Sequence, residues 1–265
     1  MCNYMGHRVS YNDYITLKQV EKQASVIEAP KPYQTGFDYL DWPVIRPIGG
    51  GDWEIDTMEW GFVPTNIRSR EGVDRFRKGF KDATGKFRPP RTTLNARGEE
   101  LLLPDKMFRE AALNRRCLVI ASYFYEWRHV QVRGKRGELL KTPEKYPYYI
   151  GVKNSPKYFF MAGIWERWED YKSHELVDTF AVCTTAANPL MAQIHNSQQR
   201  MPTILNEDLA AEWISEELSG NRITEIATHQ IKSEEMEFWN IPKNFKDLPD
   251  PTIKFCYDEL PELAA

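Results

Sequence analysis

Apolar residues along the chain recur mostly with the period of β-strands. Residues 53–63, 117–127, 146–152, 158–165 and 180–184 are short runs rich in aromatic and β-branched side chains, which is typical of strands with at least one buried face. The run at 117–127 contains few polar residues and predicts a buried strand. A Lys-Asn-Ser-Pro sequence before the fourth run predicts a turn.

Helical spacing is confined to a few segments. Apolar positions in residues 11–23 follow the period of a helix, and residues 105–113 predict a shorter one. Two more helices are expected after Asn188 and Asn206, because asparagine is a favourable residue at helix N-termini. The strands do not alternate regularly with helices, so the pattern predicts an α+β fold rather than a doubly wound parallel sheet.

The composition narrows the class of protein. The chain of 265 residues is long enough to bury a sizeable core, and its aromatic content of 13% argues against disorder. Neither an apolar run of about 18 residues nor a secretory signal is seen, so we expect a cytoplasmic protein without membrane contact. The cysteines at positions 2, 117, 183 and 256 form no paired metal-binding motif. We therefore expect free thiols, no metal and no cofactor.

Charge is unevenly distributed along the chain. The net charge is −3, yet residues 65–93 contain nine Lys and Arg against three acidic residues, whereas residues 204–265 contain fourteen acidic and five basic residues. The basic stretch contains Gly79, Gly85 and a Pro-Pro pair and predicts a long loop. Such a loop is either a solvated charged segment or a local site for a polyanion, and both interpretations stay open.

A carboxylate interrupts the most apolar of the predicted strands. Within Ser-Tyr-Phe-Tyr-Glu-Trp, residues 122–127, strand alternation places Glu126 on the same face as Phe124. A buried carboxylate is costly unless it is paired or protonated. Glu126 is therefore either a structural partner of Arg115 or Arg116, or an acid–base catalyst whose pKa is raised toward neutrality by burial.

Two further stretches carry side chains suited to catalysis or to phosphate binding. Residues 95–100 offer Asn95, which can both donate and accept hydrogen bonds, and Arg97, whose guanidinium fits a phosphate. Alternatively, they form an ordinary junction between a strand and a loop. His195 follows a predicted helix and is either a proton shuttle or a helix-end residue bound to a backbone carbonyl.

Cys2 directly follows the initiator methionine. Its position is either chance or, after removal of Met1, the source of a terminal amine and a thiol on one residue. A terminal α-amine has a pKa of about 8, so part of it is neutral and can attack an aldehyde to form a Schiff base. The thiol can then close a thiazolidine ring, a product that an internal cysteine cannot form.

Six short motifs, in order, resemble the SOS response-associated peptidase family, also called abasic-site processing proteins. They are Met1-Cys2, Trp-Gly-Phe-Val-Pro at 60–64, Asn-Ala-Arg-Gly-Glu-Glu at 95–100, Arg-Cys-Leu-Val-Ile-Ala-Ser-Tyr-Phe-Tyr-Glu-Trp at 116–127, Met-Ala-Gly-Ile-Trp at 161–165, and Ile-His followed by Arg-Met-Pro-Thr-Ile-Leu within 194–205. The resemblance implies a single complex α+β domain over residues 1–265, with a barrel-like, bifurcated β-sheet flanked by helices. Residues 65–93 are then a basic loop, and residues from about 240 to 265 a C-terminal extension.

The resemblance also implies an activity. Members of the family bind single-stranded DNA that contains an abasic site and cross-link to its aldehyde through the N-terminal cysteine as a thiazolidine, which shields the lesion. Met1 is lost beforehand, in some members by self-cleavage. For this chain, the resemblance implies a DNA–protein cross-linking enzyme of DNA repair with associated autopeptidase and lyase-type activity, which is nucleoid-associated when bound to DNA. We expect no obligatory protein partner.

Carried over by position, the resemblance assigns four catalytic residues. Cys2 is the nucleophile, and Asn95 positions its amine. Glu126 assists ring opening and the proton transfers around the Schiff base, and His195 is a second proton donor or acceptor. The residues implied to contact DNA are Arg97, Arg200, Lys106, Trp60, Trp42, Pro43 and Thr184.

The chain also departs from the family pattern. The family usually has Gly and Arg after the cysteine, where this chain has Asn3 and Tyr4. The change removes a cationic contact to phosphate, and Tyr4 can stack on a base instead. More residues separate His195 from Arg200 than the family usually has. The basic loop is also long for the family and either extends the DNA footprint or is disordered.

Two other functions stay open from the residues. Cys2, His195 and an acid could form a cysteine-type peptidase that acts on other proteins. The basic loop also fits a non-covalent reader of modified or single-stranded nucleic acid. Loss of the Cys2 thiol separates these hypotheses, because a reader keeps its function without it.

Overall fold

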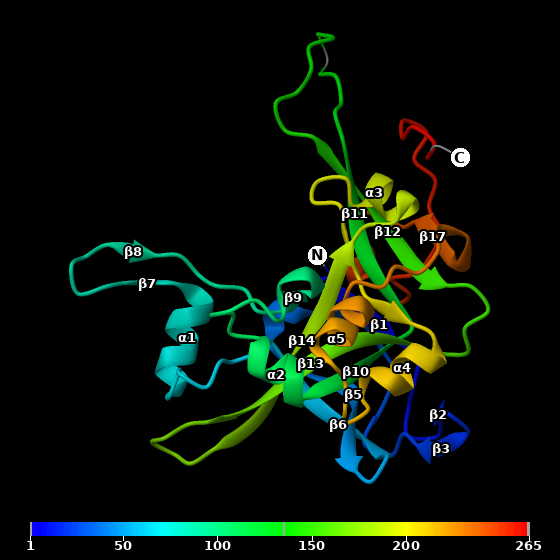
Figure 1. The fold of residues 1–265 in the computed structure, drawn as a ribbon. Coiled ribbons are helices and arrows are strands. Elements are labelled where there is room, and N and C mark those ends of the chain that lie inside the picture. The colour runs from blue at the N-terminus through cyan, green and yellow to red at the C-terminus, as the bar shows by residue number, and fades with distance from the viewer. Residues whose placement is uncertain (1, 135, 264–265) are drawn as a thin grey trace.

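The computed structural model describes residues 2–134 and 136–263 and confirms the predicted α+β class, with a barrel-like sheet flanked by helices (Figure 1). The strands are β1 (Tyr4–His7), β2 (Tyr14–Leu17), β3 (Val20–Gln23), β4 (Lys31–Thr35), β5 (Asp41–Gly49), β6 (Asp52–Trp60), β7 (Phe80–Lys81), β8 (Phe87–Arg88), β9 (Asn95–Arg97), β10 (Arg116–Ala121), β11 (Tyr123–Val130), β12 (Glu144–Val152), β13 (Phe159–Glu169), β14 (Leu176–Ala186), β15 (Arg200–Pro202), β16 (Ile204–Leu205) and β17 (Met236–Asn240).

The helices are short and lie outside the sheets (Figure 1). They are α1 (Arg70–Lys78), α2 (Arg109–Asn114), α3 (Pro189–Ile194), α4 (Glu207–Trp213) and α5 (Gly220–Ala227), with 3₁₀ turns at Gly36–Asp38, Gly98–Glu100, Ser233–Glu235 and Phe245–Asp247. As predicted, Asn188 and Asn206 accept hydrogen bonds from backbone N–H groups in the first turns of α3 and α4. Within the described ranges, no helix has the length and apolar character needed to cross a lipid bilayer.

Five strands of the larger sheet close into a barrel. Within the ring, β5, β6, β10, β13 and β14 each pair with two neighbours, and the pairing of β13 with β14 joins the ends of the series. β6 and β14 run parallel, whereas the other contacts in the ring are antiparallel, so the barrel is mixed. β9, β15 and β16 extend the sheet at its edges. Closure leaves these five strands without a free edge.

The second sheet, in the order β17-β12-β11-β1-β4, holds the N-terminal strand in its interior. β1 pairs antiparallel with β11 on one side and with β4 on the other. At Gly6, a Cβ atom would lie 2.2 Å from the Tyr123 ring and 2.6 Å from the carbonyl oxygen of Pro32. Only glycine permits this close approach. The first residues of the chain are therefore held on both sides.

β10 and β11 are consecutive in the chain but belong to different sheets. The sequence predicts one strand at 117–127, and the structure divides it at Ser122. The Ser122 hydroxyl accepts a hydrogen bond from the backbone N–H of Arg8 at 2.8 Å and donates one to the carbonyl oxygen of Lys157. A single polar side chain thus ties the two sheets together where they diverge.

The faces of the barrel strands define two parts of the core. Leu118 and Ile120 of β10 pack in a cluster with residues of α2, α4 and α5. Val119 and Ala121 point to the other face, into a cluster that also contains Cys2. Cys2 is fully buried in this second cluster and therefore lies inside the core rather than on the surface.

The predicted helix at residues 11–23 is wrong. These residues contain the hairpin β2–β3, with Lys18 and Gln19 at φ values of 51° and 64°, the left-handed values that a tight two-residue turn requires. Ile15 and Leu17 are buried, and the residues beside them are exposed. The period of burial is therefore two, and tertiary pairing overrides the apparent helical spacing.

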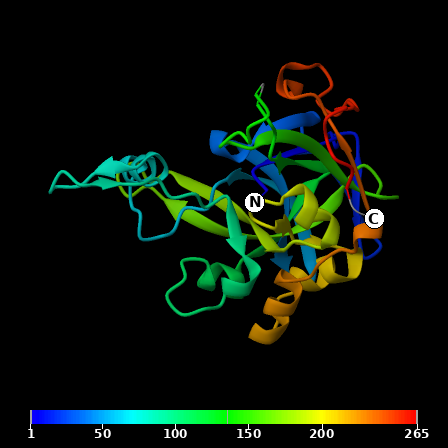
Figure 2. The same cartoon turned by 90° about the horizontal axis from the view of Figure 1, so that it is seen from above.

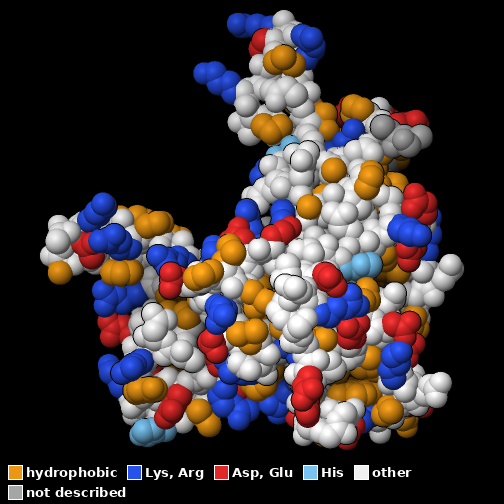
Figure 3. Space-filling model, in the orientation of Figure 1, with side chains coloured by type: hydrophobic (Ala, Val, Ile, Leu, Met, Phe, Trp, Pro, Cys, Tyr) orange, Lys and Arg blue, Asp and Glu red, His pale blue; other side chains and the backbone are white. Residues whose placement is uncertain are grey.

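The predicted basic loop at 65–93 contains α1 and the hairpin β7–β8, and we call these residues the arm. The arm extends from one side of the barrel (Figures 1 and 2) and carries several Lys and Arg side chains on the face in view in Figure 3. Val73 of α1 packs with Val63 and Trp168, and the Trp168 indole donates to the carbonyl oxygen of Ile67. The base of the arm is thus anchored on β13.

We predict that Arg116→Gln lowers the free energy of unfolding by about 3 kcal/mol. The Arg116 side chain is buried and donates to the carbonyl oxygens of Ala112, Leu113, Trp213 and Ser215 at 2.6–2.9 Å. These carbonyls end α2 and α4, and removing their donor leaves them buried and unsatisfied. Urea denaturation measures the change.

The exposed Arg109→Gln variant is the matched control, because it removes the same charge from the start of α2. It should change the free energy of unfolding by no more than about 0.5 kcal/mol. Equal effects of the two substitutions would contradict this role of Arg116.

Candidate active site

The site is built where β1 and β11 meet. In this antiparallel pair, Met5 lies opposite Phe124 and Gly6 opposite Tyr123. Continuing the register toward the start of the chain brings the segment of Cys2 and Asn3 beside Glu126 of β11. The sheet therefore brings the first residues of the chain next to a carboxylate more than one hundred positions away.

Glu126 is buried, with 4% of its surface exposed. Burial raises its pKa from 4.5 to about 7. Arg115 pairs instead with Glu166 at 2.7 Å, and Arg116 binds backbone carbonyls. The structural alternative, in which Glu126 pairs with one of these arginines, is therefore wrong. A carboxyl with this pKa can both donate and accept a proton near neutral pH.

His195 is at the C-terminal end of α3 and faces Glu126. Its Nε2 lies 3.7 Å from a carboxylate oxygen of Glu126, and its Nδ1 lies 2.7 Å from the carbonyl oxygen of Arg200. The Nδ1 contact requires a proton on that nitrogen, because a carbonyl only accepts. Burial lowers the pKa of His195 to about 4, so the ring is neutral at physiological pH.

Cys2 is fully buried beside these groups. Burial raises the pKa of its thiol well above the ordinary value, and the negative charge of Glu126 adds to the effect. The sulfur is therefore a thiol rather than a thiolate at neutral pH. It is suited to react after another group has attacked, with a neighbouring base to take its proton.

Asn95 reaches the same place from β9, which pairs in parallel with β14. Its Nδ2 donates to the Oδ1 of Asn3 at 2.9 Å. Among the described residues, its own Oδ1 is buried without a hydrogen-bond partner. An unsatisfied buried carbonyl is costly, and here it is available as an acceptor next to the segment that holds Cys2.

Arg200 is close to the site, but its side chain is engaged. Both terminal nitrogens of Arg200 bind the carboxylate of Glu99, at 2.7 and 2.8 Å, and one also donates to the carbonyl oxygen of Thr184 at 2.6 Å. Thr184 is fully buried. In this structure, Thr184 therefore supports Arg200 instead of the predicted DNA contact, and a phosphate at Arg200 would have to compete with Glu99.

Arg97 and Lys106 lie at the surface beside Asn95. All three residues line a cleft of about 330 Å³. Arg97 and Lys106 share the carboxylate of Glu100, at 3.3 and 2.5 Å, and both side chains are at least 40% exposed. Exposed pairs of this kind are weak and open readily to a phosphate.

The rings of Trp42 and Trp60, predicted to pack against bases, are in the core. Both residues are fully buried, and their indole N–H groups donate to the carbonyl oxygens of Ile120 and Leu94. Pro43 is also buried in β5. Neither tryptophan has a face on which a base could stack, so these two contacts are corrected: the rings fill the barrel instead.

The structure places Tyr4, which the sequence suggested as a stacking residue, beside Trp127 and Lys246, which the sequence did not single out. A cleft of about 360 Å³ is lined by Tyr4, Glu126, Trp127, His129, Lys145, His195, Ser197 and Lys246. The Tyr4 and Trp127 rings are 4.7 Å apart, edge to face, and the Lys246 ammonium lies 4.7 Å from the Tyr4 ring. Lys246 comes from the predicted C-terminal extension and carries no motif, so nothing in the sequence signals its position.

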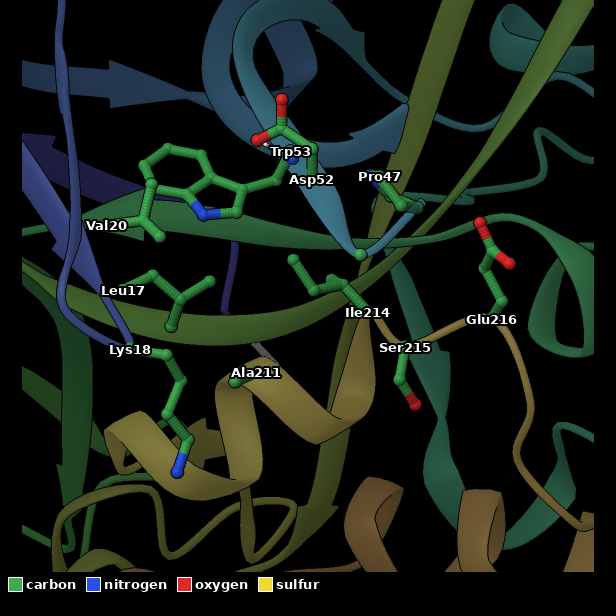
Figure 4. Close-up of a pocket in the computed structure, with 11 residues that line it drawn as sticks. Leu17, Lys18, Val20, Pro47, Asp52, Trp53, Ala211, Ile214, Ser215 and Glu216 are labelled. Atoms are coloured by element: carbon green, nitrogen blue, oxygen red, sulfur yellow. Dashed lines mark hydrogen bonds between the residues drawn. The ribbon is translucent and has the colours of Figure 1, made fainter. Parts of the chain in front are cut away.

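A separate cavity of about 270 Å³ lies between the hairpin β2–β3, the β5–β6 turn and α4 (Figure 4). Its carboxylates are already engaged: Asp52 accepts from Lys22 at 2.5 Å, and Glu216 accepts from the backbone N–H of Gly50 at 3.1 Å. None of the predicted site residues lines it. Nowhere among the described residues, this cavity included, are three His, Cys, Asp or Glu side chains grouped closely enough to hold a metal ion.

Comparisons with known proteins agree with this geometry. The family model described as "SOS response associated peptidase (SRAP)" matches residues 6–247. Abasic site processing protein YoaM of Bacillus subtilis is 28% identical over 166 residues, which are 63% of this chain and 59% of YoaM. Abasic site processing protein YoqW of the same bacterium is 26% identical over 201 residues, which are 74% of this chain and 75% of YoqW. A crystal structure of a Bacteroides thetaiotaomicron protein is 29% identical, with a TM-score of 0.68 over 84% of this chain and 85% of that one.

We predict that Glu126 makes the protein less stable as the pH rises from about 4.5 to about 7. Its pKa is about 7 in the folded chain against an ordinary value of 4.5, so the folded state binds the proton more tightly, and this stabilisation is lost once the proton leaves. Relative to Glu126→Gln, the wild type should lose on the order of 3 kcal/mol between pH 4.5 and pH 7.5. Urea denaturation at both pH values measures the difference.

His195→Gln is a control of opposite sign. The pKa of His195 is about 4 in the folded chain against an ordinary 6.5, so its contribution to stability is lost as the pH falls through that range. A difference between wild type and Glu126→Gln that stays constant with pH would contradict the assignment of Glu126.

Proposed function

The chain belongs to the SOS response associated peptidase (SRAP) family, and from this premise we propose that it is an abasic-site processing protein that forms a covalent cross-link with single-stranded DNA through Cys2. The relatives named above as abasic site processing proteins support the substrate. The matched part spans 59% of YoaM and 75% of YoqW. The proposal includes prior removal of Met1, which gives Cys2 a free amine.

One observation carries the proposal. A buried carboxyl with a pKa of about 7, Glu126, faces a neutral imidazole and adjoins the thiol of the second residue in the chain. A group that is half protonated near pH 7 can give a proton to a leaving hydroxyl and accept it again in the next step. A purely structural carboxylate would more usually have a lowered pKa.

The chemistry balances without an oxidant or reductant. The deoxyribose at an abasic site opens from its cyclic form to an aldehyde, assisted by Glu126. The neutral amine of Cys2 attacks the aldehyde carbon, and loss of one water gives an imine. The Cys2 sulfur then bonds to the imine carbon, and its proton ends on the nitrogen, which closes the thiazolidine. The raised thiol pKa fits this order, with the amine acting first.

The other site residues take supporting roles. His195 relays protons with Glu126 at the sugar, since its Nε2 faces that carboxyl. Asn95 holds the start of the chain through Asn3 and has an acceptor oxygen available for the Cys2 amine. The exposed Arg97 and Lys106 contact phosphates, and Arg200 does so if its pair with Glu99 opens. Tyr4, Trp127 and Lys246 receive the base or phosphate beside the lesion.

A general cysteine peptidase is the second candidate function, and the raised pKa of the Cys2 thiol argues against it. Peptidases of this kind depend on a thiolate with a lowered pKa, whereas burial raises the pKa of Cys2. Self-removal of Met1 is a narrower reaction, in which one water hydrolyses the Met1–Cys2 bond once per molecule. A non-covalent reader of nucleic acid would form no adduct at all.

We predict that Cys2→Ala abolishes the covalent adduct with single-stranded DNA containing one abasic site. Alanine keeps the amine but cannot close the thiazolidine, so any imine that forms hydrolyses. Denaturing electrophoresis after heating, with mass spectrometry of the intact adduct, measures the outcome.

Cys117→Ala is the matched control, because this cysteine is equally buried but lies in β10. It should leave the adduct yield unchanged. A heat-stable adduct in Cys2→Ala would eliminate the thiazolidine mechanism. Turnover of peptide substrates that depends on Cys2, without any DNA adduct, would favour the peptidase instead.

We also predict that Glu126→Gln slows adduct formation by roughly 10²–10³-fold, the usual contribution of a positioned acid–base group. Glutamine keeps the shape of the side chain but cannot exchange a proton. Non-covalent affinity for undamaged single-stranded DNA should change by less than about two-fold, a small change on the scale of binding free energies. An unchanged adduct rate would remove Glu126 from the mechanism.

A further inference from the structure

The arm contains a pocket that the proposed chemistry does not use. The pocket measures about 560 Å³ and lies between α1 and the strands of the arm hairpin. It is lined by four arginines and two phenylalanines, with no acidic residue: Asn66, Ile67, Arg68, Gly72, Arg75, Phe76, Phe80, Arg88, Pro89 and Arg91. Four guanidinium groups around one hollow repel one another unless an anion joins them.

The arginines are not neutralised equally. Arg88 pairs with Asp82 at 2.8 Å, and Arg75 lies 4.0 Å from Glu71 and 4.3 Å from the centre of the Phe80 ring. In the described chain, no carboxylate oxygen lies within 4.0 Å of the guanidinium of Arg68 or Arg91. The Arg68 guanidinium lies 5.1 Å from the centre of the Tyr171 ring, a contact that leaves its forked donors available. Arg68 and Arg91 thus line the pocket without a protein anion to bind.

The pocket is held on a fixed base. Arg77 of α1 is mostly buried and pairs with Glu59 of β6 at 2.6 Å, and its guanidinium lies 3.8 Å from the Tyr39 ring. Arg70 binds Glu175 through two hydrogen bonds, at 2.7 and 2.9 Å. Since α1 is tied to neighbouring strands at both ends, this wall of the pocket does not need to be ordered when a ligand arrives.

The arm begins and ends beside the active site. At its root, the backbone N–H of Phe62 donates to the carbonyl oxygen of Thr93 at 3.3 Å, and the Thr93 hydroxyl donates to the carbonyl oxygen of Phe62 at 2.6 Å. Asn95 follows two residues after Thr93. A strand of DNA held at Asn95 thus has the base of the arm as its neighbour.

We propose that the arm pocket binds the phosphate backbone of single-stranded DNA outside the abasic-site cleft, as a second, lesion-independent contact. The guanidinium groups of Arg68 and Arg91 bind phosphate oxygens. The half-buried rings of Phe76 and Phe80 receive an unpaired base, which selects a single strand over a duplex, whose bases are already stacked. The proposal rests on the proposed function only in taking DNA as the partner.

The test compares two double variants of the arm. Arg68→Gln/Arg91→Gln removes two charges at the pocket, and Lys81→Gln/Lys86→Gln removes two charges from the same arm outside its lining. The probe is an undamaged, fluorescein-labelled single strand of 20 nucleotides, followed by anisotropy at several salt concentrations. The pocket variant should bind at least about five-fold more weakly, and its salt slope should fall by about 1.4, because each single-strand phosphate contact contributes about 0.7.

The control variant should lose less than two-fold in affinity. Equal losses in the two variants would mean that the arm attracts DNA only through its overall positive charge, and the proposed pocket contact would be wrong. An unchanged affinity in the pocket variant would contradict the proposal as well. Displacement of the strand by an equal concentration of thymidine monophosphate would assign the pocket to a free nucleotide and would also overturn the proposal.

Adduct formation separates this inference from the proposed function. With saturating abasic DNA, which fills the site in both proteins, the rate of cross-linking should be the same in the wild type and in Arg68→Gln/Arg91→Gln, because neither arginine lines the cleft at Glu126 or the cleft at Asn95. If the wild type forms no adduct but the difference in anisotropy persists, the proposed function fails and the arm contact stands. If adducts form but the two variants bind undamaged DNA with the same affinity, the arm contact fails and the proposed function stands.

Discussion

The placement of β1 between β11 and β4 is the constraint on which the site depends. A terminal strand at a sheet edge would leave the first residues exposed and free to fray. Here both edges of β1 are hydrogen-bonded, and Gly6 lets Tyr123 close over it. The second residue of the chain is consequently fixed inside the core. Everything proposed for Cys2 follows from this order, since a reactive group on a mobile terminus could not be aligned with Glu126.

Burial then sets the protonation states of Glu126, Cys2 and His195. The same apolar surroundings raise the pKa of Glu126 and of the Cys2 thiol and lower that of His195. All three groups are driven toward their neutral forms, which suits proton exchange between uncharged partners. Exposed cationic side chains surround these groups, at Lys145 and Lys246 in the same cleft and further out at Arg97, Lys106 and the arm, where a polyanion would first be met. The reacting groups are thus buried, and the charges that attract a polyanion lie around them.

The sequence predicted the barrel strands β6, β10, β13 and β14, because their aromatic and β-branched runs are continuous and strongly patterned, but it missed β5. It failed at residues 11–23, where alternate burial of Ile15 and Leu17 is decided by contacts with distant strands. It also could not divide 117–127 at Ser122, because the break depends on partners at Arg8 and Lys157. Motif positions drew attention to Glu126 and His195, but Trp60 shows that an aromatic residue in a motif can belong to the core. Lys246 carries no local signal.

The root of the arm has a consequence for how such a protein can change over evolutionary time. Phe62 and Thr93 are joined by two hydrogen bonds, so the two ends of the arm are held together whatever lies between them. The cost of a longer loop grows only slowly with its length once its ends are fixed. Insertions and deletions between these two residues can accumulate while β9 keeps its place. The arm can therefore be remodelled independently of the barrel that carries it.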